Sequence, residues 1–259
     1  MGKHLIDLNS DLGESFGAWK MGMDSDVMKS VCSANVACGF HAGDALVMVE
    51  TVKAAKQNGV AVGAHPGHPD LQGFGRRTMA CTPDEVYAYT LYQIGALQAV
   101  CAAQGVRMEH VKAHGALYNQ AAKDLAMAKA IAQATKDAAG DLILLGLANS
   151  LFEQAAAEVG VPYAAEAFAD RGYMNDGSLV PRSKPGAFIH DLAEAGRRMV
   201  RLVKEGVVES AEGKEIHLKV HSICMHGDNP AAVEMARSIR KTLEENGVMI
   251  ATMREVLKG

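Results

Sequence analysis

The sequence predicts an α/β barrel of the TIM type, in which parallel strands alternate with helices. Short apolar runs are followed by Gly-rich polar loops and then by amphipathic segments, which indicates parallel strands joined by helical crossovers. Reactive side chains follow nearly every strand, as expected where all strand ends open onto one mouth. No G-x-G-x-x-G follows the first strand, which disfavours a dinucleotide-binding sheet.

Eight short apolar segments are strand candidates. The clearest is 142–147, an uninterrupted apolar run typical of a strand buried on both faces. The others are 4–8, 31–37, 60–64, 110–113, 161–165, 217–222 and 248–251.

Helices with recognisable caps lie between these strands. Asp44 is expected to cap a helix that ends at Asn58, because Gly59 suits the left-handed position after a helix. The run Thr82-Pro-Asp-Glu85 is a capping box that opens a helix ending near Gly105. Further helices are predicted at 120–139, 150–159, 190–205 and 228–246, the last with Asp228 as its expected cap.

Length and composition indicate one folded domain, 1–259. The chain has 259 residues, 49% hydrophobic and 22% charged, with a formal net charge of −4. Lys and Arg are scattered along the chain, so no nucleic-acid partner is expected. The sequence has no long apolar run and no signal peptide, so no membrane partner is expected either. Five cysteines without a C-x-x-C pair indicate reduced thiols and a cytoplasmic location.

Polar and ionisable residues cluster just after the predicted strands. Any one of them has an ordinary explanation as a helix cap, a loop residue or a packed side chain. Histidines in four separate strand-end loops are less easily explained one by one, so we expect one shared site. The candidates are Asn9, Asp11 and Glu14, then Asn35 and His41, His65, His114 and Tyr118, Asp170 and Arg171, and finally His226.

Two chemistries suit such a set. One is a divalent metal held by mixed nitrogen and oxygen ligands, and the other is metal-free general acid–base catalysis. No G-x-S-x-G elbow and no Walker motif occurs, and Cys38 and Cys224 are interpreted as small buried residues rather than nucleophiles. Within this site Asp11, Glu14, His65 and His114 are the expected catalytic residues. The expected substrate-binding residues are Asn9, Asn35, His41, Tyr118, Asp170, Arg171 and His226.

Seven motifs, in order from the first strand to the last helix, resemble those of the LamB/YcsF family. They are 7–14 (DLNSDLGE), 33–44 (SANVACGFHAGD), 63–70 (GAHPGHPD), 73–77 (GFGRR), 114–119 (HGALYN), 166–173 (EAFADRGY) and 226–228 (HGD). The resemblance implies a distorted (β/α)7 barrel, similar to the glycoside hydrolase/deacetylase superfamily. It also implies ATP-dependent opening of the lactam of 5-oxo-L-proline (pyroglutamate) to L-glutamate, in a complex with subunits B and C.

ATP, with its Mg²⁺, is then the expected co-substrate, because a lactam is a poor electrophile and phosphorylating its oxygen would activate the ring carbon. In the deacetylase-like relatives a metal is held by one Asp and two His, which by position would be Asp11, His65 and His114 here. Two other hypotheses remain open. The chain could be a stand-alone metal-dependent deacetylase or amidohydrolase, or a non-catalytic subunit that presents the substrate to its partners.

Overall fold

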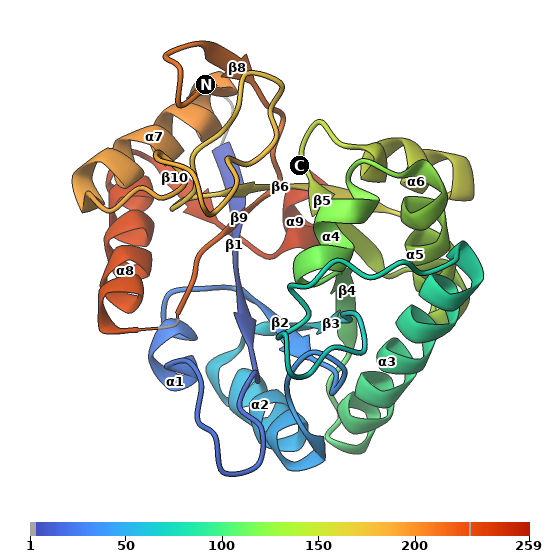
Figure 1. Cartoon of the computed structure of the whole chain (residues 1–259). Helices are drawn as coiled ribbons and strands as arrows, with labels where there is room; N and C mark the ends of the chain where they lie inside the picture. The colour runs from blue at the N-terminus through green and yellow to red at the C-terminus, as the bar shows by residue number, and fades with distance from the viewer. Residues whose placement is uncertain (1–3, 228) are drawn as a thin grey trace.

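Seven parallel strands form a closed barrel in the computed structural model, which describes residues 4–227 and 229–259. The strand order is β1-β2-β3-β4-β5-β6-β9, and β9 pairs back onto β1 to close the ring. Helices surround the strands (Figure 1). The predicted barrel class is therefore confirmed. The barrel strands are β1 (His4–Leu12), β2 (Ser33–Ala37), β3 (Ala61–His65), β4 (Met108–Lys112), β5 (Ile143–Leu147), β6 (Tyr163–Phe168) and β9 (Ser222–Cys224).

The helices begin and end largely where their caps predict. Asp44 accepts hydrogen bonds from two backbone amides at the start of α2, and Gly59 ends that helix with φ 66°. Thr82 and Glu85 form the predicted capping box of α3. The helices are α1 (Asp24–Val27), α2 (Ala45–Asn58), α3 (Pro83–Ala103), α4 (Gly115–Ala121), α5 (Leu125–Ala138), α6 (Leu151–Val159), α7 (Leu192–Glu205), α8 (Pro230–Glu245) and α9 (Met253–Val256).

Two predicted helices differ in detail. The segment 120–139 is not one helix, because α4 ends at Ala121. Asp124 then accepts hydrogen bonds from two backbone amides of the following turn and starts α5. Asp228 lies outside the described residues. The N-cap of α8 is Asn229, whose side chain accepts from the amide of Ala232.

The predicted strand at 217–222 is wrong. Its first part belongs to β8 (Glu215–His217), which pairs antiparallel with β7 (Val207–Glu209) in a hairpin outside the barrel. Leu218, between β8 and β9, is buried in the core, so the apolar pattern of this segment reports core packing rather than a barrel strand. The barrel strand β9 begins only at Ser222.

The first strand is longer than predicted. It continues to Leu12, because parallel pairing with β2 extends from Asn9 to Leu12. Asn9 and Asp11 therefore lie on the strand itself and not in the loop after it. Near its start β1 also pairs with β10 (Val248–Ile250), which lies outside the closed ring.

The two ends of the barrel differ in chemistry. Near the strand starts, Ile143, Leu145 and Ala164 pack with Met253 of α9 in an apolar cluster. Toward the carboxyl ends the interior carries Asn, Asp, His, Lys and Glu side chains. Among the described residues, no helix is both long enough and apolar enough to cross a membrane.

Candidate active site

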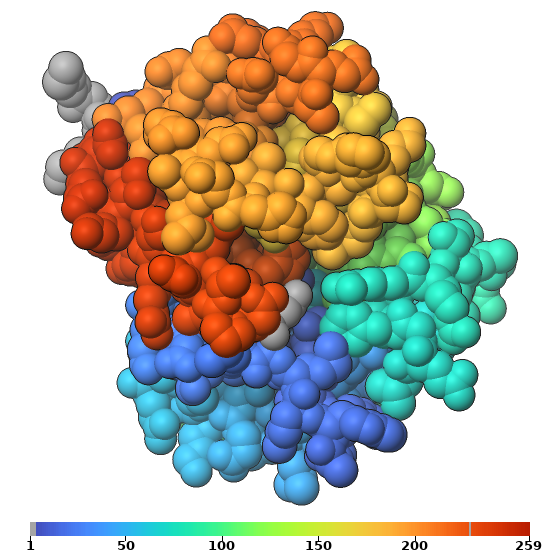
Figure 2. Space-filling model, turned by 60° about the vertical axis from the view of Figure 1, so that its left-hand side comes forward, coloured from blue at the N-terminus to red at the C-terminus, as the bar shows by residue number. Residues whose placement is uncertain are grey.

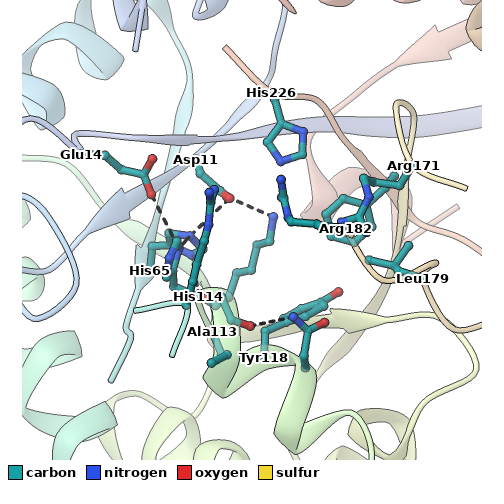
Figure 3. A pocket seen from close by; sticks show the side chains of 16 residues that line it. Asp11, Glu14, His65, Ala113, His114, Tyr118, Arg171, Leu179, Arg182 and His226 are labelled. Atoms are coloured by element: carbon teal, nitrogen blue, oxygen red, sulfur yellow. Dashed lines mark hydrogen bonds and ion pairs between the residues drawn. The ribbon is translucent and has the colours of Figure 1, made fainter. Parts of the chain in front are cut away.

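A cavity of about 170 Å³ opens at the carboxyl ends of the strands (Figure 3). The segment between β6 and α7 (yellow-orange), the loop after β1 (blue) and the segment between β3 and α3 (teal) share the face shown in Figure 2. Seven of the predicted site residues line this cavity, namely Asp11, Glu14, His65, His114, Tyr118, Arg171 and His226. The barrel therefore brings together side chains that are more than 200 positions apart in the chain.

Asn9 and Asn35 do not line this cavity, contrary to our expectation for them. Both are fully buried beneath it, since strand residues that point inward fill the barrel. Asn35 Nδ2 donates to Asn9 Oδ1 at 2.7 Å and to Asp11 Oδ1 at 2.8 Å. The two amides thus position the ionisable groups above them.

Lys112, at the end of β4, occupies the centre of the mouth. Its Nζ lies 3.0 Å from Asp11 Oδ1 and 2.9 Å from Glu166 Oε1. Burial opposes its charge, but the surrounding groups, Asp11 first, raise the pKa of Lys112 well above its usual value. It is a permanent buried cation.

Glu166 connects this lysine to a second predicted residue. Tyr118 donates its hydroxyl to Glu166 Oε2 at 2.7 Å, and Asn9 donates to Oε1 at 2.9 Å. Each carboxylate oxygen therefore has a donor. Tyr118 is positioned to face the cavity by this bond.

Three imidazoles and one carboxylate form a second group on the other side of Asp11. The rings of His41 and His114 are parallel with centroids 3.7 Å apart, and His65 stands perpendicular to both. Glu14 Oε1 lies 3.3 Å from His41 Nε2 and 3.6 Å from His114 Nδ1. His41 faces a neighbouring cavity of about 260 Å³, which also includes Glu14.

The electrostatics assign different charge states to these groups. Burial acts against ionised Asp11, yet His65 and Lys112 together hold the pKa of Asp11 well below its usual value. Burial, reinforced by neighbouring histidines, lowers the pKa of His114 to about 3 and that of His41 well below 6.5. At neutral pH the site therefore presents an ionised carboxylate beside neutral imidazoles, which can act as bases or ligands.

Arginines form another part of the cavity lining, here called the arginine wall. Arg76, Arg171 and Arg182 all line the cavity, and Arg171 and Arg182 both lie over the ring of Phe188. Arg171 donates Nε to Ala187 O at 3.0 Å and Nη2 to Val180 O at 2.6 Å. Asp170 is paired with His226 Nδ1 at 2.7 Å rather than with the neighbouring arginine. Both members of that pair border a third cavity of about 570 Å³.

The sequence interpretation assigned no role in the site to Lys112, Glu166 or His110. All three lie on predicted or observed strands, where a polar residue is read as part of a strand rather than of a site. Lys112 did carry a signal, because a lysine near the end of a buried strand needs partners. His110 Nε2 lies 2.7 Å from Asn35 Oδ1, so it belongs to the layer beneath the cavity.

The fold and the site together define a βα-barrel protein whose ionisable side chains gather at the carboxyl ends of its strands. The LamB/YcsF family model matches residues 6–258. The chain belongs to the LamB/YcsF family.

Relatives in this family match nearly end to end. The chain is 54% identical to a protein from Pyrococcus horikoshii that is named as the A subunit of 5-oxoprolinase, covering 98% of this chain and 99% of that one. A protein of the same name from Bordetella parapertussis is 54% identical over 95% of this chain and 97% of its own. Among solved structures, a lactam utilization protein from Thermus thermophilus superposes with a TM-score of 0.91 at 48% identity. That match covers 95% of this chain and 99% of the other.

Proposed function

We propose that this chain is the subunit of an ATP-dependent 5-oxoprolinase that holds the lactam of 5-oxo-L-proline while its ring is opened to L-glutamate. The observation that carries the proposal is a small cavity that combines an ionised Asp11, neutral imidazoles and an arginine wall. The names of the relatives, which describe a 5-oxoprolinase component and a lactam utilization protein, support the choice of a lactam as substrate.

The polarity of the cavity suggests how the lactam is oriented. The carboxylate of 5-oxoproline pairs best with a guanidinium of the arginine wall, which binds it through two parallel hydrogen bonds. The amide of the ring then faces Asp11 and the histidines, where protons are exchanged. Lys112 provides fixed positive charge beneath the ring, where negative charge develops as water adds.

The chemistry requires ATP because the amide is unreactive. Transfer of the terminal phosphoryl group to the lactam oxygen releases ADP and activates the ring carbon. Water then adds to that carbon, the carbon–nitrogen bond breaks, and the nitrogen takes a proton, which leaves an acyl phosphate. A second water releases inorganic phosphate and the γ-carboxylate of glutamate. Asp11 and the neutral histidines are the proton acceptors nearest to the cavity.

The assignment is tested by measuring glutamate and ADP formed from 5-oxoproline and ATP, with this chain alone and with partner subunits B and C added. With no Walker motif in its sequence, the chain alone should be nearly inactive, and the partners should restore turnover. Rapid ring opening by the single chain without ATP would refute the proposal and favour a stand-alone amidohydrolase.

The substitution Asp11→Asn distinguishes a catalytic subunit from one that only presents the substrate. If this chain takes part in the chemistry, Asp11→Asn should abolish turnover of the complex. Binding of 5-oxoproline should be roughly kept, because Asp11 exchanges protons and is not the carboxylate anchor. Full turnover by the Asp11→Asn complex would show that the chemistry takes place in another subunit.

A further inference from the structure

Four side chains bring possible metal-ligand atoms close together beside the cavity. His41, His65, His114 and Glu14, here called the histidine cluster, each offer an atom within 4.8 Å of the other three. They come from the loop after β1, the loop after β2, the end of β3 and the residue before α4. His65, His114 and Glu14 also line the site cavity, so the point where they meet is accessible to a substrate.

Backbone carbonyls determine which ring nitrogens carry protons. His65 Nδ1 lies 2.8 Å from the carbonyl oxygen of Lys112, and His114 Nε2 lies 2.8 Å from that of Phe74. A carbonyl oxygen only accepts, so both of these nitrogens must be protonated. The other two ring nitrogens, His65 Nε2 and His114 Nδ1, are then left to face the centre of the cluster.

Those two nitrogens lie 3.0 Å apart. A single cation, either a proton or a metal ion, stabilises two imidazole nitrogens at that distance. A proton bridges only two atoms, whereas a metal ion takes several ligands at once. The carboxylate oxygen of Glu14, 3.6 Å from His114 Nδ1, faces the same point, and so does His41 Nε2.

We propose that the histidine cluster binds one divalent metal ion through His65 Nε2, His114 Nδ1, His41 Nε2 and Glu14 Oε1. Three imidazoles and one carboxylate suit zinc or a similar late first-row ion better than magnesium or calcium, which prefer oxygen ligands. Donation of the outer ring N–H to a backbone carbonyl is the arrangement typical of histidines that bind metal. A bound ion would supply polarisation of a carbonyl oxygen or of water at this wall of the cavity.

This ligand set differs from the one implied by the deacetylase-like relatives, in which Asp11 takes the place of Glu14 and His41. Asp11 Oδ1 is engaged by Lys112 and Asn35, and only its Oδ2 approaches the cluster, 3.3 Å from His65 Nε2. Asp11 therefore remains available for proton transfer. The proposal rests on the proposed function only for the role of the ion and not for its binding.

The loop between β3 and α3 packs closely against the cluster. A Cβ atom added to Gly67 would lie 2.7 Å from His41 Nδ1, and one added to Gly75 would lie 2.7 Å from His41 Cβ. The backbone of this loop therefore packs directly against the imidazoles. Such preorganisation favours a single bound geometry.

The experiment uses the full chain, stripped with a chelator and titrated with Zn²⁺ and Co²⁺ in the absence of any lactam. Calorimetry should show one ion bound per chain, and Co²⁺ should develop the visible absorption of a site with nitrogen ligands. His114→Gln and Glu14→Gln should each lose this binding. Glu14 is half-buried in a loop, so its variant tests the site with little risk to folding, which circular dichroism verifies.

The matched control is His68→Gln. His68 is another buried histidine, lies in the loop between β3 and α3, and has Gln120 as its partner. This variant should bind metal like the unchanged chain, as should Asp11→Asn. The proposal is overturned if the unchanged chain binds no metal, or if Glu14→Gln retains binding while Asp11→Asn loses it. Because no substrate is present, a chain that binds metal but shows no oxoprolinase activity with its partners would refute only the proposed function.

Discussion

At the barrel mouth a single charged side chain can determine the charge states of its neighbours, and Lys112 is the clearest case. It is the cation shared by two carboxylates, Asp11 and Glu166, that are otherwise close to each other in a buried region. Removing one member of a buried ion pair leaves the others without compensation. The identity of this residue therefore affects both folding and the charge state of the site.

Lys112→Met should lower the free energy of unfolding by about 3–5 kcal/mol, because it leaves two buried carboxylates facing each other. Chemical denaturation would measure the loss. Lys129→Met is the control, since Lys129 pairs with Glu158 at an exposed position, and an exposed pair contributes about 0–1 kcal/mol. Equal effects of the two substitutions would contradict the central role of Lys112.

Arg171→Lys should raise the KM for 5-oxoproline far more than the KM for ATP if Arg171 is the carboxylate anchor. Loss of a desolvated anchor of this kind costs about 2–5 kcal/mol of binding. Arg237→Lys, at an exposed position, is the control. An unchanged KM would show that Arg171 only holds the backbone at Val180 and Ala187, and Arg76 and Arg182 would then be the candidate anchors.

Asp7 should make stability depend on pH in the direction opposite to an ordinary carboxylate. Burial raises its pKa from 3.8 to about 7, against hydrogen bonds from Ser222 and Ser33. Between those two pH values the folded chain keeps the proton that the unfolded chain releases. The contribution is therefore complete below pH 4 and is lost as pH rises to about 7.

Asp7→Asn should remove that contribution to the slope of stability against pH. The measurement is Tm from about pH 4.5 to about pH 8 in both proteins. The fall in Tm with rising pH that Asp7 causes should be present in the unchanged chain and missing in the variant. If both proteins lose stability in parallel over this range, Asp7 is ionised in the folded state.

At the level of elements, the loop between β3 and α3 is the part of the structure that shapes the site most directly. It carries two glycines whose missing side chains make room for His41 and His114. Gly75 also has φ 61°, a left-handed conformation that glycine adopts without strain. The glycines of this motif therefore have a packing reason as well as a conformational one.

Gly75→Ala should displace the imidazoles and reduce turnover on the order of 100-fold, since its Cβ would lie 2.8 Å from His114 Cδ2. Gly59→Ala is a matched control, because Gly59 has a similar φ of 66° but no atom within 4 Å of an added Cβ. Both substitutions should cost about 1–2 kcal/mol of stability through backbone strain. Equal turnover in the two variants would show that the loop does not determine the position of the histidines.

Some elements were predictable from short-range patterns and others were not. The caps of α2 and α3 were predicted correctly because a cap depends on a few adjacent residues. The segment 217–222 was predicted as a barrel strand but connects β8 to β9, because an apolar run looks the same whether it pairs inside the barrel or packs outside it. The true extent of β1 depended on its pairing with β2, which lies more than 20 residues away.

For the whole molecule, the barrel separates stability from function along its axis. The polar mouth is at the carboxyl ends of the strands, and α9 contributes Met253 to an apolar cluster near the strand starts. In barrel enzymes this division allows the loops to change without loss of the core.

Met253→Ala should lower the free energy of unfolding by about 2–5 kcal/mol because it creates a cavity in that cluster. The KM values of the complex should stay the same, since the cluster is remote from the mouth. Met249→Ala, at an exposed position on β10, should have little effect on either quantity. A changed KM in Met253→Ala would show that the two ends are coupled.

By itself, the sequence determined the alternation of strands and helices, the barrel class and the collection of polar residues at the strand ends. These features follow from local periodicity, caps and turn residues, which act over a few positions. Only the tertiary structure decided that Lys112 lies between Asp11 and Glu166, that Asn9 and Asn35 lie beneath the cavity, and that ring nitrogens of His65 and His114 lie 3.0 Å apart. Those relations depend on barrel closure and strand register, which join residues up to 215 positions apart and leave no mark in any short stretch of sequence.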